Sequence, residues 1–205
     1  MATSSDQGLA GVWTLYQAKA QTDQKDPQGR TALHIAVWSG SLHIVDLLLH
    51  CSDVNGADLY GRTPLFLSSF LGHLPMTRLL VEAGANKQKT DPTGRSPLHT
   101  ATVGGHFAVV RFLIEAGANR NQVDRYGSTP LMEAARLGHV ELVRLFLQAG
   151  VDVLKADRFG RTPLDAARAA GHLRVTRCLM DHAPQALPAL PAPGKHRRPA
   201  KSAWV

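Results

Sequence analysis

The strongest constraint on the fold of this chain is a motif that recurs about every 33 residues. Each copy has an aspartate, a glycine three residues later, and then a hydroxyl residue and a leucine that open an apolar stretch. The glycines that mark the copies are Gly29, Gly61, Gly94, Gly127 and Gly160. Their separations, by subtraction, are 32, 33, 33 and 33 residues. A unit this short cannot bury its own apolar face, so the copies must stack on one another.

Local signals within each copy predict a turn followed by two helices. The aspartate side chain can accept backbone N–H groups two or three positions further on and close a turn. The marker glycine supplies the positive φ that such a turn needs. A threonine or serine then suits the N-cap of a helix, and in four copies a proline follows in the first helical turn. A second glycine ends this helix, and a strongly apolar second helix follows.

The stretch Asp124-Arg-Tyr-Gly-Ser-Thr-Pro-Leu131, with a Thr-Pro-Leu-His-x-Ala core at this spacing, resembles the ankyrin repeat. The resemblance implies an all-α solenoid of stacked helix-turn-helix units with β-turn or hairpin fingers. We expect five repeats over residues 26–183 and a degenerate capping half-repeat over residues 9–25, for which an ordinary amphipathic leader helix is the alternative. Residues 1–8 and the Pro/Ala-rich basic tail at 184–205 are expected to be disordered.

Charge and composition narrow the class of protein. The net charge is +7, but residues 185–205 contribute +4 of it, so the repeats are close to balanced. The two cysteines form no CxxC pair and predict a reducing compartment. No basic leader and no long apolar run is present, so we expect neither a signal peptide nor a transmembrane helix. These features favour an intracellular protein, cytoplasmic or nuclear.

No motif predicts catalysis or a cofactor. The sequence contains no GxxxxGK, HExxH or GxSxG pattern and no zinc-type cysteine spacing. Most of the ten histidines recur once per repeat, which would spread them along the stack instead of gathering them on a metal ion. We therefore expect their nitrogens to order the turns by hydrogen bonding. The chain is predicted not to be an enzyme and to hold no metal.

In proteins that this chain resembles, the turn tips and the exposed side of the first helix grip protein partners. Trp, Tyr and Arg dominate such interfaces because they bury a large area around a polar group. Carried over by position, the predicted partner-binding residues are Trp38, Leu59, Tyr60, Phe70, Leu71, Arg125, Tyr126, Arg136, Leu137, Arg158 and Phe159. The alternative is that some of them, Trp38 and Phe70 above all, pack between neighbouring first helices.

Three further signals concern partners. Arginines follow the marker glycines and recur on the second helices, and they could track phosphates, but acids balance them, so we expect no nucleic-acid binding. The tail residues Lys195, Arg197, Arg198 and Lys201 form a basic patch that either aids nuclear import or keeps the tail solvated. The end Ala203-Trp-Val205 is a candidate ligand for a PDZ-type groove, although Ala203 lacks the hydroxyl most such ligands carry.

Together these observations predict a monomeric, non-enzymatic protein–protein interaction module. It would act as an adaptor, scaffold or inhibitor that binds a partner protein in the concave groove of the repeats. A nuclear regulator that masks a transcription factor or kinase would use the same surface and the basic tail. A substrate receptor for a ubiquitin ligase would carry a helical box after the repeats, which the tail does not offer. A nucleic-acid-associated protein is the remaining alternative.

Overall fold

The computed structural model describes residues 22–182, in which ten helices form five consecutive pairs. The first helices of the pairs are α2 (Ala32–Trp38), α4 (Pro64–Leu71), α6 (Pro97–Val103), α8 (Pro130–Leu137) and α10 (Pro163–Ala169). The second helices are α3 (Leu42–Leu49), α5 (Leu74–Glu82), α7 (Phe107–Glu115), α9 (Val140–Gln148) and α11 (Leu173–His182). Most of the predicted half-repeat at 9–25 and the tail at 184–205 lie outside the described residues, so these domain bounds stay predictions.

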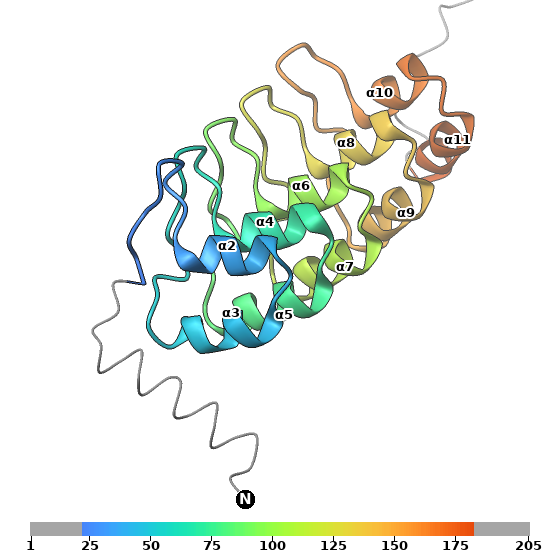
Figure 1. Cartoon of the computed structure of the whole chain (residues 1–205). Helices are drawn as coiled ribbons and strands as arrows, with labels where there is room; N and C mark the ends of the chain where they lie inside the picture. Colours follow the sequence, from blue (N-terminus) through green and yellow to red (C-terminus); the bar gives the residue numbers. More distant parts are fainter. Residues whose placement is uncertain (1–21, 183–205) are drawn as a thin grey trace, which may run out of the picture.

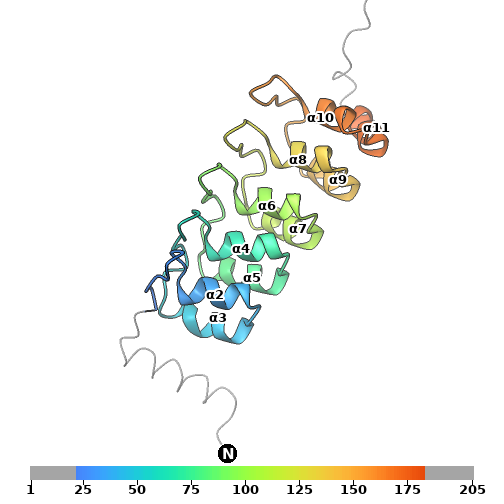
Figure 2. The same cartoon turned by 45° about the horizontal axis from the view of Figure 1, so that its top comes forward.

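The pairs stack side by side into an elongated solenoid. The first helices form one row, the second helices form a parallel row, and the turns that precede the first helices project as a third row of fingers (Figures 1 and 2). Residues 22–182 contain no strand, and backbone turn hydrogen bonds help to close the fingers. The prediction of an all-α solenoid of helix-turn-helix units is confirmed.

The first helices begin where the capping signals predict. Four of these helices start at the proline; they are α4, α6, α8 and α10. Proline has no backbone N–H, and in the first helical turn an N–H would have no helical partner, so its lack costs little there. The hydroxyl of the preceding residue accepts a backbone N–H three positions on, as Thr63 does from Phe66 at 3.1 Å and Thr129 from Met132 at 3.3 Å. α4 and α8 end at Gly72 and Gly138, both left-handed, a conformation that glycine adopts without strain.

The aspartate of each finger organises the turn, with one difference from the prediction. Its Oδ1 accepts the N–H group two residues on, as predicted, but its second bond comes from the N–H group four residues on. Asp58 accepts from Tyr60 at 2.9 Å and from Arg62 at 2.8 Å. The reason is that the backbone closes over the same span, because Asp58 N–H donates to the carbonyl of Arg62 at 3.0 Å. The turn is therefore one residue wider than a simple aspartate turn.

Backbone hydrogen bonds also join neighbouring fingers. The N–H of Leu59 donates to Gln28 O at 3.0 Å, that of Arg125 to Thr93 O at 2.9 Å, and that of Arg158 to Tyr126 O at 2.9 Å. The corresponding donor in the third finger is Pro92, which has no N–H, so this bond cannot form between the second and third fingers. The row of fingers is thus tied together at three of its four junctions.

Stacking buries a continuous apolar core between the two rows of helices. Each first helix contributes a leucine that is fully or almost fully buried; these are Leu33, Leu65, Leu98, Leu131 and Leu164. They pack in one cluster with residues of the second helices, such as Leu80, Leu113 and Phe146. Each such side chain stabilises the fold by roughly 1.5–3 kcal/mol, which one helix pair alone could not obtain.

His34 and His99 order the turns by hydrogen bonding, as predicted, but the buried Nε2 of His139 has no hydrogen-bond partner within residues 22–182. His34 is fully buried; its Nδ1 accepts the N–H of Thr31 at 3.2 Å, and its Nε2–H donates to Arg62 O of the next finger at 3.0 Å. His99 repeats the arrangement with Ser96 and with Ser128 O at 3.2 Å. Burial lowers the pKa of both imidazoles, although their hydrogen bonds to carbonyls oppose the shift.

Candidate functional site

A groove of about 530 Å³ lies between the fingers and the first helices of the last two repeats. Its lining residues come from three fingers and from α8 and α10. They are Arg95, Asp124, Tyr126, Ser128, Met132, Glu133, Arg136, Asp157, Phe159, Arg161, Thr162, Ala166, Ala169 and Ala170. We call this surface the Tyr126–Phe159 groove.

Two aromatic side chains at the finger tips form the outer part of the groove. Tyr126 is 44% exposed and Phe159 is 68% exposed, although the backbone of each is held by a finger hydrogen bond. Arginines cover ring faces: the guanidinium carbon of Arg125 lies 4.7 Å from the Tyr126 centroid, and that of Arg161 lies 4.9 Å from the Phe159 centroid. The rings are therefore oriented by the fold and remain open to a ligand.

The floor of the groove combines small apolar side chains with paired charges. Ala166, Ala169 and Ala170 leave the space that larger residues on α10 would fill. Glu133 is almost completely buried, and its Oε2 accepts from Arg136 Nη2 at 2.6 Å. Burial opposes ionisation of Asp157, but hydrogen bonds from the Arg161 and Phe159 amides and the Arg161 side chain outweigh it and lower its pKa. Glu133 and Asp157 are thus each paired with an arginine.

The structure brings three of the predicted partner-binding residues together in this groove: Tyr126, Arg136 and Phe159. Trp38, Tyr60 and Phe70 lie on the same rows in the first two repeats, each at least half exposed, so none is a fully buried packing residue. Leu59 is highly exposed at the tip of the second finger.

The remaining predicted residues lie outside the groove lining. Leu71 and Leu137 are half-buried at the ends of α4 and α8. Arg125 and Arg158 are exposed finger residues, and the first of these covers Tyr126. The basic patch of Lys195, Arg197, Arg198 and Lys201 and the C-terminal tripeptide lie beyond the described residues.

Sequence reasoning missed the buried acid of the groove. Glu133 occupies the fourth position after the helix-capping residue, where the other copies have Ile35, Leu67, Thr100 and Ala166. A charged residue at a position that is otherwise uncharged was the available signal. Met132 and Asp124 were also missed, because their places in the repeat pattern predict structural roles only.

The described part of the chain contains neither a cluster of metal-binding side chains nor a helix that could span a membrane. Within residues 22–182, no group of three or more His, Cys, Asp or Glu side chains is placed to hold a metal ion. In the same span, no helix is both long and apolar enough to cross a lipid bilayer.

Stacked helix pairs with projecting fingers define a repeat solenoid, a class whose members present extended binding surfaces. Within this class the chain belongs to the ankyrin-repeat family, because the family model for ankyrin repeats (three copies) matches residues 1–91 and 86–157. Ankyrin repeats indicate a protein–protein interaction module, so this is the general role that the fold supports.

The matches to individual relatives cover only a small part of each relative's length. A fem-1 homolog A-like protein of Mus musculus is 35% identical over 79 residues, which are 38% of this chain and 12% of the relative. The photoreceptor ankyrin repeat protein of Homo sapiens is 41% identical over 63 residues, 30% of this chain and 14% of the relative. Leucine-rich repeat serine/threonine-protein kinase 1 of Caenorhabditis elegans is 34% identical over 83 residues, 35% of this chain and 4% of the kinase.

Proposed function

We propose that this chain is a non-enzymatic interaction module that binds a segment of a partner protein in the Tyr126–Phe159 groove. The observation that carries the proposal is the groove itself, in which two exposed aromatic rings flank small apolar side chains and paired charges. Aromatic residues and arginine dominate binding energy at protein interfaces. A role as adaptor, scaffold or inhibitor in the cytoplasm or nucleus would rest on this surface.

A preformed surface supports a steric mechanism. The finger backbones on both sides of the groove are joined by the hydrogen bond from Arg158 N–H to Tyr126 O at 2.9 Å, and Phe159 already lies beneath Arg161. Binding would therefore order few groups on this side of the interface, which limits the entropic cost of association. The module would hold or mask its partner without chemical change.

The proposal is tested by capturing partners from a cell lysate with four full-length baits: the natural chain, Tyr126→Ala/Phe159→Ala, Phe107→Ala, and a tail variant with Lys195, Arg197, Arg198 and Lys201 replaced by alanine. Phe107 is an exposed aromatic at the start of α7, outside the groove, and so controls for loss of a surface ring.

We expect at least one protein to be captured by the natural chain, the Phe107 variant and the tail variant but not by the groove variant. Circular dichroism and thermal unfolding must first show that all four baits are folded. Capture that survives the groove substitutions and is lost with the tail variant would contradict the proposal and assign recognition to the basic tail.

A further inference from the structure

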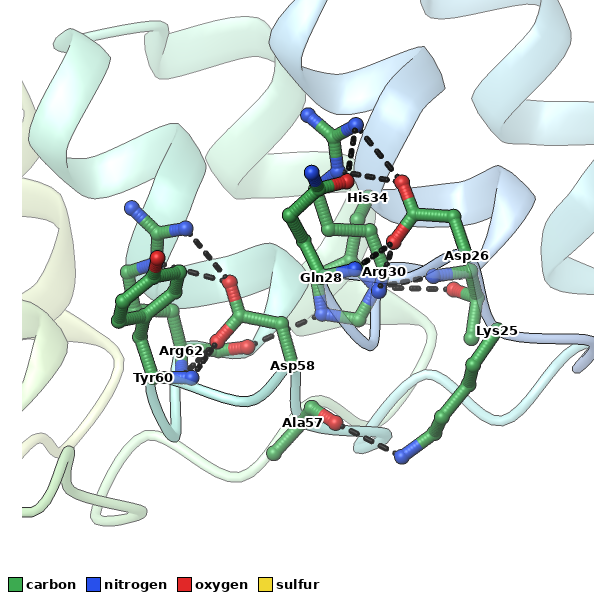
Figure 3. Close-up of polar contacts among 10 residues, drawn as sticks. Lys25, Asp26, Gln28, Arg30, His34, Ala57, Asp58, Tyr60 and Arg62 are labelled. Atoms are coloured by element: carbon green, nitrogen blue, oxygen red, sulfur yellow. Dashed lines mark hydrogen bonds and ion pairs between the residues drawn. The ribbon is translucent and has the colours of Figure 1, made fainter.

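Three of the five fingers hold an arginine in the same way. The arginine four residues after the finger aspartate donates to that aspartate's Oδ2, with Nε at 2.7 Å in Arg30, 2.8 Å in Arg62 and 2.9 Å in Arg161. The Nη2 atom of each also lies 2.7–2.8 Å from Oδ2. Figure 3 shows the arrangement in the first two fingers. Where an aromatic residue stands two positions before the arginine, its ring lies beneath the guanidinium: Tyr60 at 4.7 Å and Phe159 at 4.9 Å.

The fourth finger has the aspartate and the aromatic residue but not the arginine. Asp124 Oδ1 accepts the N–H of Tyr126 at 2.8 Å and of Ser128 at 2.9 Å, and Asp124 N–H donates to Ser128 O at 3.0 Å. The backbone is thus the same as in the other fingers, and Ser128 replaces the arginine side chain. The fourth finger therefore lacks only the guanidinium that would donate to Asp124 Oδ2.

Asp124 is consequently a buried carboxylate without a counter-ion. The residue is 5% exposed, and no cation of residues 22–182 forms an ion pair with it. The equally buried Asp58, by contrast, is paired with Arg62 at 2.7 Å. Two backbone N–H groups hold Asp124 Oδ1, and a cation from a partner would add the ion pair that Arg62 supplies to Asp58.

The Tyr126–Phe159 groove opens at this place. Asp124, Tyr126 and Ser128 line it together with Glu133, whose Oε1 accepts from Ser128 Oγ at 3.3 Å and whose Oε2 is paired with Arg136. Three other arginines are near. Arg95 lines the groove from the preceding finger without reaching ion-pair distance of Asp124, Arg161 lines it while paired with Asp157, and Arg125 covers a face of Tyr126. The groove therefore offers a carboxylate, an aromatic ring and open space in the relation that the second and fifth fingers fill with Arg62 and Arg161.

We propose that this part of the groove receives an arginine side chain of the bound partner. The inference rests on the proposed function, since it names the chemistry of the peptide that the groove would take. The incoming guanidinium donates to Asp124 Oδ2 as Arg62 does to Asp58, lies against Tyr126, and directs a further N–H towards Glu133. Arginine fits better than lysine because its planar fork can donate to a carboxylate and stack on a ring together. The apolar surface of Met132, Phe159 and the alanines of α10 then takes a neighbouring apolar residue of the partner.

The test uses peptides selected on the full-length natural chain from a random twelve-residue library displayed on phage. Each enriched peptide is synthesised with its arginine and with citrulline, which keeps the shape but removes the charge. Dissociation constants are measured for both forms on the natural chain, Ser128→Arg, Gln148→Arg and Tyr126→Ala/Phe159→Ala. Ser128→Arg restores the arginine of the sister fingers and should fill the site, while Gln148→Arg adds the same charge at the exposed end of α9, outside the groove.

We expect enriched peptides to contain arginine beside an apolar residue and the citrulline form to bind at least about tenfold more weakly. Ser128→Arg should weaken the arginine peptide by a similar factor, whereas Gln148→Arg should change its affinity by less than about twofold. If enriched peptides bind through Tyr126 and Phe159 but citrulline binds equally well, the arginine site is refuted and the groove remains. If no enriched peptide depends on Tyr126 and Phe159, the proposed function fails and the arginine site fails with it.

Discussion

Phe146 and Phe159 should separate stability from binding, because one ring is wholly inside the core and the other is on the surface. Phe146 is 0% exposed in the second half of α9, and Phe159 is 68% exposed at a finger tip. Phe146→Ala removes the full burial of a ring and leaves a cavity, so the expected loss in the free energy of unfolding is about 3–5 kcal/mol. Phe159→Ala removes about a third of that burial and one surface cation–π contact, together about 1 kcal/mol.

Thermal and chemical unfolding of the two variants measure this difference directly. About 1 kcal/mol lowers Tm by roughly 2–4 °C in a protein of this size, so Phe146→Ala should lower it by roughly 6–20 °C and Phe159→Ala by only a few degrees. In contrast, partner capture should be lost with Phe159→Ala combined with Tyr126→Ala. A stability loss for Phe159→Ala as large as that for Phe146→Ala would show that the finger-tip ring is a packing residue and would remove the physical basis for the groove.

Two other predictions concern the fingers and the histidines that contact them. Gly94→Ala should lower the free energy of unfolding by at least about 2 kcal/mol, because Gly94 has φ +80° and its added Cβ would lie 2.8 Å from Arg125 N. Gly84→Ala is the control: Gly84 has φ +86° but no atom within 4 Å of the added Cβ, so the loss should be only the roughly 1–2 kcal/mol of the strained backbone. Equal losses of the two variants in urea titrations would contradict the close contact at Gly94. Stability should also fall as pH drops below the ordinary histidine pKa of 6.5, because burial lowers the pKa of His34 and His99, so the unfolded chain binds protons that the folded chain does not. The variant His34→Met/His99→Met is chosen because Met132 occupies the same repeat position. Its free energy of unfolding should fall less than that of the natural chain between about pH 7.5 and 5. An equal fall in both proteins would show that these two imidazoles do not cause the pH dependence.

The repeat boundaries and helix starts could be predicted because they depend on residues close together in the chain. The prolines of α4, α6, α8 and α10 and the hydroxyl residues before them act within a single helical turn. The one local error, the span of the aspartate turn, arose because the closing bond from Asp58 N–H to Arg62 O involves backbone atoms that no side-chain pattern reveals.

The candidate site could be predicted only in part. The turn-tip positions of Tyr126 and Phe159 followed from the repeat, but the pattern treated all five fingers alike and offered eleven residues over four repeats. The structure distinguishes the last two repeats because Ala166, Ala169 and Ala170 leave space beside Met132 and Glu133. The depth of the groove depends on the side-chain volumes of both α8 and α10, which lie about 33 residues apart in the chain. The sequence of either helix alone therefore does not reveal the groove.

The stack of ankyrin repeats follows from the sequence alone, because the 33-residue period, the helix caps and the apolar faces are local properties that recur in every copy. The folded chain is needed to show which surface residues share a groove and that Asp124 has no arginine paired with it within residues 22–182. In the sequence, Ser128 is simply a serine at a repeat position where the other copies have arginine. The fold places it beside the buried Asp124 and the open space of the groove. The physical reason is that the consequence of a missing side chain depends on what surrounds it, and those surroundings come from neighbouring repeats.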